Sequence, residues 1–153
     1  MKIFTIGYLG WKKQSLIEVL KKNGIKTLVD VRRSPKSKNP DWDKSSILTS
    51  CRLNGMEYVS FTNLGLEYKD WHNAEWRTAY KKYAEENIEL TKQQLSRLTQ
   101  PIALMCKEKK HEHCHRAILA EVLKNHNCDI IHIKEEGEDS GTIQTSRMLD
   151  DWC

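Results

Sequence analysis

Short apolar segments of strand length alternate along this chain with longer segments of helical spacing. The strand-like segments are rich in β-branched and apolar residues, and there are five of them: residues 2–6, 27–31, 56–61, 102–106 and 129–133. Helical spacing lies between them, at residues 15–23, 45–53, 73–98 and 114–125. Alternation of this kind is typical of βαβ units, so the sequence predicts an α/β fold.

The fourth strand-like segment gives the most information about the sheet. Residues 102–106 are apolar throughout, as in a strand that is covered on both faces. We therefore expect three layers, with helices on both faces of a mostly parallel five-stranded sheet. The predicted strand order is 3-2-1-4-5, numbered along the chain, with the switch point between the first and the fourth strand. Ligands of such sheets bind beyond the carboxyl ends of the strands, near that point. A short helix is also expected over residues 144–151.

Length and composition restrict the class of protein. A chain of 153 residues has the size of one ordinary domain, and we expect residues 1–153 to form one. No apolar run approaches the roughly 20 residues of a membrane-spanning helix, and the first residues resemble a strand more than a signal peptide. We therefore expect a cytoplasmic protein without a membrane partner.

The five cysteines have no disulfide-framework spacing, which favours reduced thiols. A net charge of +4 permits a polyanionic partner without requiring one.

Polar residues lie where three of the predicted strands end, and we expect them to meet at one edge of the sheet. They are Gly7 and Tyr8 after the first strand, Asp30 and Arg32 at the second, and Cys106 and Glu108 at the fourth. Asp30 interrupts an apolar strand, so its carboxylate needs a partner, and Arg32 points to the same side. Two interpretations stay open: Asp30 and Arg32 orient or grip a substrate, or they form a structural ion pair.

Cys114, His115 and Arg116 open the helix that follows the fourth strand. The first turn of a helix offers free N–H groups and a partial positive charge, which together bind anions. Arg116 adds donors that suit phosphate, His115 exchanges protons near neutral pH, and Cys114 is expected to have a lowered thiol pKa. The sequence thus predicts an anion-binding or nucleophilic site. Alternatively, each of these residues, and Cys106 with them, serves only packing or surface charge.

A metal site is a second possibility, because five soft ligands fall within ten residues: Cys106, His111, His113, Cys114 and His115. The spacing lacks paired Cys-x-x-Cys units, and no second ligand pair follows. We therefore predict no metal and no other cofactor.

Aromatic residues form a further candidate surface. Tyr8, Trp11, Trp42, Trp71, His72 and Trp76 stand near Lys12, Lys13, Lys36, Lys38 and Lys44, and such a set can stack bases and hold a phosphate backbone. Trp76 has helical spacing with Tyr80 and Tyr83, which indicates a core position. Trp11 and Trp42 adjoin polar loops and are expected to be exposed, as substrate-binding residues.

Several short motifs together resemble one family. They are Thr5 to Tyr8, Leu28 to Arg32 with Pro35 and Ser37, Tyr58 with Leu64-Gly65, Leu104 to Cys106 with Glu108, and Cys114 to Arg116. In order and spacing they are similar to the domain of unknown function family DUF488. The resemblance implies a small α/β fold and recurrent polar positions at Gly7, Asp30, Arg32, Pro35, Cys106, Glu108, Cys114, His115 and Arg116. It implies no reaction. One departure is Tyr8, where many relatives carry His. The Asp-Val-Arg segment also resembles rhodanese-type sulfurtransferases faintly, without their glycine-rich anion loop.

The leading functional hypothesis is an enzyme or enzyme-like domain that acts on a phosphate-bearing substrate such as a nucleic acid or a nucleotide. Arg32 and Arg116 would bind anionic groups, with Gly7, Tyr8, Trp11 and Trp42 around them. His115 or Glu108 would be the acid or base, oriented by Asp30, and Cys106 or Cys114 would shape the pocket or act as nucleophile. The alternatives are a non-enzymatic module that binds a nucleic acid or a protein, and a thiol- or metal-dependent redox protein. The sequence does not identify protein partners.

Overall fold

The computed structural model describes residues 1–65, 75–107, 115–134 and 143–145. Its sheet contains six strands in the order β3-β2-β4-β1-β5-β6. The strands are β1 (Lys2–Gly7), β2 (Thr27–Asp30), β3 (Glu57–Ser60), β4 (Ile102–Cys106), β5 (Asp129–Ile133) and β6 (Ile143–Thr145). The first five pair in parallel, whereas β6 runs antiparallel to β5. The α/β class and the five parallel strands are confirmed, and β6 replaces the first two residues of the helix expected over 144–151, whose remainder lies outside the described residues.

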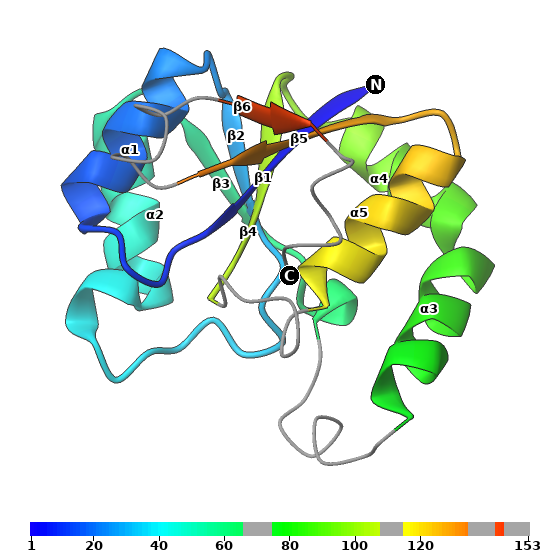
Figure 1. Cartoon of the computed structure of the whole chain (residues 1–153). Helices are drawn as coiled ribbons and strands as arrows, with labels where there is room; N and C mark the ends of the chain where they lie inside the picture. The colour runs from blue at the N-terminus through cyan, green and yellow to red at the C-terminus, as the bar shows by residue number, and fades with distance from the viewer. Residues whose placement is uncertain (66–74, 108–114, 135–142, 146–153) are drawn as a thin grey trace.

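The predicted strand order is wrong. β4 lies between β2 and β1, with Gly7 opposite Cys106 on one side and Asp30 opposite Met105 on the other. The chain leaves β1, passes over one strand position and forms β2, and β4 later fills the vacant position. β1 and β4 are still neighbours, and the chain continues from them to helices on opposite faces (Figure 1). The loops after β1, β2 and β4 share the carboxyl edge of the sheet.

The helices divide into two groups. Figure 1 shows α1 (Lys13–Lys22) and α2 (Lys44–Leu53) on one side of the sheet, and α3 (Trp76–Glu86), α4 (Ile88–Ser96) and α5 (Arg116–Asn125) on the other. Two 3-10 turns, η1 (Pro40–Trp42) and η2 (Thr62–Leu64), interrupt the loops after β2 and β3. α1 begins at Lys13, two residues before the start that the sequence predicts, with Lys12 as its N-cap.

Because side chains alternate along the strands, the buried apolar residues form two clusters, one on each face of the sheet. Val29, Val31 and Cys106 belong to the cluster beneath α3 to α5, whereas Leu28 and Met105 belong to the cluster beneath α1 and α2. Successive strand residues point to opposite faces, so each polar residue at a strand end also belongs to one face. No helix in the described part of the chain is both long and apolar enough to cross a bilayer.

Candidate functional site

The polar residues at the carboxyl edge form two sets on opposite faces of the sheet. Tyr8 and Trp42 pack in the cluster beneath α1 and α2. Asp30 faces this side too, because it alternates along β2 with Leu28, a residue of the same cluster. Cys106 packs in the cluster beneath α3 to α5. His115 contacts the ring of Tyr80, a residue of α3 in that second cluster. The single crevice that the sequence predicts is therefore divided by the sheet itself.

The first set centres on a buried ion pair. Asp30 and Arg32 are 0% and 7% exposed, and Arg32 grips the carboxylate through Nη2 at 2.7 Å and through Nε at 2.9 and 3.1 Å. The backbone N–H of Arg32 also donates to Asp30, at 3.1 Å, and the Tyr58 hydroxyl donates to it at 2.5 Å. Burial alone would lower the pKa of Arg32, but the hydrogen bonds and charge of Asp30 raise it above its ordinary value. Burial, reinforced by the Asp30 charge, raises the pKa of Tyr58.

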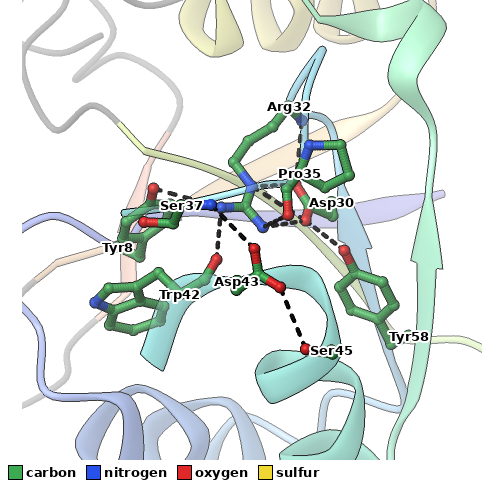
Figure 2. A network of polar contacts seen from close by, with 9 residues as sticks. All are labelled: Tyr8, Asp30, Arg32, Pro35, Ser37, Trp42, Asp43, Ser45 and Tyr58. Atoms are coloured by element: carbon green, nitrogen blue, oxygen red, sulfur yellow. Dashed lines mark hydrogen bonds and ion pairs between the residues drawn. The ribbon is translucent and has the colours of Figure 1, made fainter. Parts of the chain in front are cut away.

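The same guanidinium fastens the long loop that follows β2 (Figure 2). Nη1 of Arg32 donates to the carbonyl of Trp42 at 2.8 Å and to the Tyr8 hydroxyl at 3.4 Å, and Nη2 donates to the carbonyl of Pro35 at 3.4 Å. The Tyr8 ring stacks on Trp42, with centroids 4.5 Å apart, and lies 5.3 Å from the guanidinium carbon. Burial raises the pKa of Tyr8. Arg32 therefore acts as a brace between β1, β2 and the loop, which favours the structural interpretation of the pair.

Asp43 fixes the second half of this loop. Its carboxylate accepts hydrogen bonds from the backbone N–H of Ser37 and from the Ser45 hydroxyl, both at 3.2 Å. The Ser37 bond is the main reason why the pKa of Asp43 is lowered, with the positive charge of Arg32 contributing. The backbone N–H of Lys44 donates to Pro35 at 2.9 Å. Hydrogen bonds thus hold both ends of the loop in place, while its cationic side chains are exposed to solvent.

Those exposed cations form what we call the basic rim. It consists of exposed side chains from the loops and helix starts that follow β1, β2 and β4: Lys12, Arg33, Lys36, Lys38, Lys44 and Lys107. Two carboxylates lie in the same described segments. Asp41 makes an ion pair with Lys13 at 3.9 Å, and Asp43 is held by Ser37 and Ser45. The rim is consequently an accessible surface of mainly positive charge at the edge where α/β sheets bind ligands.

Gly65 shows how closely η2 approaches the end of β2. A Cβ atom at this position would lie 2.2 Å from the backbone nitrogen of Arg33 and 2.7 Å from the carbonyl oxygen of Val31. Only glycine permits this contact. Tyr80 of α3 holds the turn from the other side by donating to the carbonyl of Leu64 at 2.7 Å.

The second set lies beneath α3 to α5 and includes Cys106, Tyr80 and His115. His115 is 5% exposed and is the N-cap of α5. Its Nε2 lies 3.2 Å from the carbonyl oxygen of Val31, so this nitrogen carries the proton and Nδ1 keeps a lone pair. Among the described residues, Nδ1 has no hydrogen-bond donor. Burial lowers the pKa of His115 to about 4, so the ring is neutral at pH 7.

Arg116 does not reach the surface. Its side chain is 0% exposed, and Nη1 donates to the hydroxyl of Thr5 at 2.8 Å. That hydroxyl also bonds to Nδ1 of His132 at 2.5 Å. Burial, followed by the charge of Arg116, lowers the pKa of His132 to about 3. Arg116 therefore connects α5 to the centre of the sheet, away from the basic rim.

Some sequence-based expectations fall where the structure gives no description. Glu108, His111, His113, Cys114, Trp71 and His72 lie outside the described residues. Within the described ranges, no three His, Cys, Asp or Glu side chains are grouped as a metal site would require. Gly7 pairs with Cys106 in the sheet, as expected for neighbouring strand ends.

A family model described as "Domain of unknown function DUF488" matches residues 12–123, which is well over half of the chain. The chain belongs to the DUF488 family. Neither the curated proteins nor the solved structures contain a significant match to it. The resemblance that the sequence motifs indicate is thereby confirmed, and the family description adds no reaction.

Two of the aromatic residues of this DUF488 chain do not lie where the sequence predicts. Trp11 and Trp42 are 9% and 6% exposed, so the expected exposure of both rings is wrong, whereas Trp76 is buried as predicted. Polar loops flank both tryptophans, but each ring folds back beneath its loop. Thr5 and His132 were missed, although each is a polar residue inside an apolar strand. Like Asp30, both are polar side chains in a buried apolar strand and need a hydrogen-bonding partner.

Proposed function

We propose that this DUF488 chain binds the phosphate backbone of a nucleic acid through the basic rim. The observation that carries the proposal is that exposed cations from three separate strand ends meet at one edge of the sheet. Phosphate contacts by Lys and Arg supply most of the sequence-independent affinity of nucleic-acid-binding proteins. The cytoplasmic location and the single domain over residues 1–153 are part of this proposal.

The bracing of the rim supports the same function. A flexible loop of lysines would lose conformational entropy on binding, whereas a loop held in place loses less. Arg32 and Asp43 hold the loop after β2 by hydrogen bonds to Trp42, Pro35 and Ser37. In this proposal Arg32 is a positioning residue, and the phosphate contacts are made by Lys36, Lys38 and their neighbours.

The test is binding of a fluorescently labelled DNA duplex at several salt concentrations, followed by anisotropy. We expect affinity to fall steeply with salt, because bound counterions are released from the DNA. The double variant Lys36→Ala/Lys38→Ala should reduce the slope of log K against log salt by about 2, since each lost phosphate contact removes about 0.9.

The matched control is Lys21→Ala/Lys22→Ala, which removes the same charge from the last turn of α1, away from the rim. We expect this control to keep nearly the wild-type slope. Equal losses in both double variants would indicate attraction by net charge alone, and absence of binding at low salt would exclude the proposal.

Catalysis on a phosphate-bearing substrate is a second candidate, favoured by one observation at the other face. Nδ1 of His115 is a buried acceptor without a donor among the described residues, in the same cluster as Cys106 and Tyr80. Buried polar atoms of this kind are usually satisfied, so exceptions mark candidate sites. Here His115 would hold or accept a substrate proton, and Cys106 would line the pocket.

A panel of nucleotides and phosphate esters would test this candidate by phosphate release. We expect His115→Gln to lower any turnover by at least about 100-fold, the usual contribution of a general acid or base. Cys106→Ser should lower it less, because Cys106 only lines the pocket. His126→Gln, in the turn after α5, is the control. Turnover that survives both site variants would exclude these roles.

A further inference from the structure

We propose that Leu9 is an apolar contact that the basic rim makes with the base pairs of duplex DNA. The inference rests on the proposed function and specifies the class of nucleic acid. Leu9 is 46% exposed in the loop between β1 and α1. The other large hydrophobic residues exposed in the described ranges belong to the N-terminus or to helices: Met1, Leu53, Tyr83 and Leu90. None of those four lies in the loops that carry the rim.

The backbone holds Leu9 in a fixed position. Its N–H donates to the carbonyl of Lys107 at 3.0 Å, and the N–H of Tyr8 donates to Cys106 at 3.0 Å. The backbone then turns at residues 8–11, where the N–H of Trp11 donates to the carbonyl of Tyr8 at 2.9 Å. Gly10 lies within this turn and has a φ of 92°. That conformation suits glycine and few other residues.

The residues on each side of Leu9 anchor this turn. Tyr8 and Trp11 are 4% and 9% exposed and pack in the cluster beneath α1 and α2. Leu9 is thus presented outward between two buried aromatic rings. A side chain presented in advance loses little entropy when it meets a ligand.

Two exposed lysines lie near Leu9 in the chain or through its hydrogen bond. Lys107, whose carbonyl accepts the Leu9 hydrogen bond, has an exposed side chain, and so does Lys12 three residues on. In this proposal the cations contact phosphates, and the aliphatic side chain of Leu9 enters the groove. Duplex-bending proteins insert Leu, Ile or Met in this way between base steps.

The burial of the aromatic rings favours a duplex over a single strand. Proteins that hold single strands stack the bases on exposed aromatic rings. On the described loops of the rim, Tyr8, Trp11 and Trp42 are all buried, so none offers a free face there. An aliphatic side chain is a poor stacking platform but a suitable wedge.

The experiment compares binding of one labelled duplex and one single strand of the same length to the wild type, Leu9→Ala and Leu53→Ala. Leu53 is 80% exposed at the end of α2 and serves as the control. We expect the wild type to prefer the duplex. Leu9→Ala should weaken duplex binding about tenfold, which corresponds to about 1.4 kcal/mol. It should leave the salt slope and single-strand binding unchanged.

The outcomes separate the two proposals. Salt-dependent binding that Lys36→Ala/Lys38→Ala weakens and Leu9→Ala does not would overturn the inference about Leu9 alone. Preference for the single strand, or equal loss on both probes, would overturn it as well. No binding to either probe at low salt would exclude the basic rim as a nucleic-acid site and Leu9 with it. Circular dichroism confirms that each variant is folded.

Discussion

At the scale of single residues, Asp30 is the group on which the loop after β2 depends most. Its carboxylate is fully buried and accepts from both Arg32 and Tyr58. Asp30→Asn removes the charge and leaves the Arg32 guanidinium buried without it. Breaking one partner of a buried pair typically costs 3–5 kcal/mol, so we expect a loss of about that size in the free energy of unfolding, measured with urea.

Tyr58→Phe is the matched control for that variant. It removes one hydrogen bond to Asp30 and leaves the ion pair with Arg32 in place. We expect a loss of only about 1 kcal/mol. If Asp30→Asn were as mild as Tyr58→Phe, the ion pair would not be the brace described here.

His115 makes the stability of the fold depend on pH. Its pKa is about 4 in the folded chain, below the ordinary value of 6.5, because the ring is buried. Above pH 6.5 the ring is neutral in both states and adds no dependence. As pH falls from 6.5 to about 4, the unfolded chain takes up a proton that the folded chain does not, so stability falls. The loss is on the order of 3 kcal/mol and is complete below pH 4.

Urea unfolding of the wild type and His115→Gln at a series of pH values would measure this effect. The two curves should run parallel above pH 6.5, and below it the wild type should lose stability relative to the variant, because only its unfolded chain takes up the His115 proton. His132, with its pKa at about 3, contributes equally to both curves. A constant difference in unfolding free energy between the two proteins across the whole pH range would contradict the low pKa of His115.

At the scale of elements, the contact between η2 and the end of β2 depends on Gly65. Gly65→Ala would place a methyl group 2.2 Å from the Arg33 nitrogen, so backbone must move. We expect a loss of about 3 kcal/mol in unfolding free energy, at the upper end of ordinary substitutions. Gly24→Ala is the comparison, because no atom lies within 4 Å of the added methyl group there, although φ is positive at 73° whereas the φ of Gly65 is −96°. It should lose only about 1–2 kcal/mol. Equal losses would mean that the contact is easily relieved.

The elements themselves were largely predictable, but the pairing of the strands was not. Apolar runs and helical spacing depend on near neighbours in the chain, and they located all five parallel strands. Strand order depends on which strand fills the gap beside β1. The apolar run of β4 does not decide this, since β4 has neighbours on both sides in the predicted and in the observed order alike.

The candidate site was predictable in its position along the chain and not in its geometry. Polar residues at strand ends were correctly located, because an interrupted apolar run is visible in the sequence. Which face each side chain takes depends on its place in the strand: Asp30 and Val31 are adjacent, yet Val31 faces α3 to α5 and Asp30, which bonds to Tyr58, faces α1 and α2. The burial of Trp42 depends on its stacking with Tyr8, a contact across 34 residues that no local pattern shows.

At the scale of the whole molecule, the sheet separates a charged, exposed edge from a set of buried polar groups. The basic rim is accessible and is held in place by Arg32. Cys106, His115 and Arg116 are 3%, 5% and 0% exposed and lie on the face of the sheet that α3 to α5 cover. Binding by the rim and chemistry near His115 are therefore separable, and variants of one should leave the other intact.

Thiol reactivity tests the remaining alternative, a redox protein. Cys51, Cys106 and Cys128 are free thiols between 0% and 3% exposed, and burial raises the pKa of Cys51 to about 12. Such thiols react only when the chain opens, because the reactive form is an accessible thiolate. In a Cys114→Ser/Cys153→Ser variant, only these three remain. We expect them to react with a disulfide reagent together, at the rate of global unfolding, and all at once in denaturant. One fast thiol in the native state that disappears with Cys106→Ser would instead show an accessible Cys106 and support thiol chemistry.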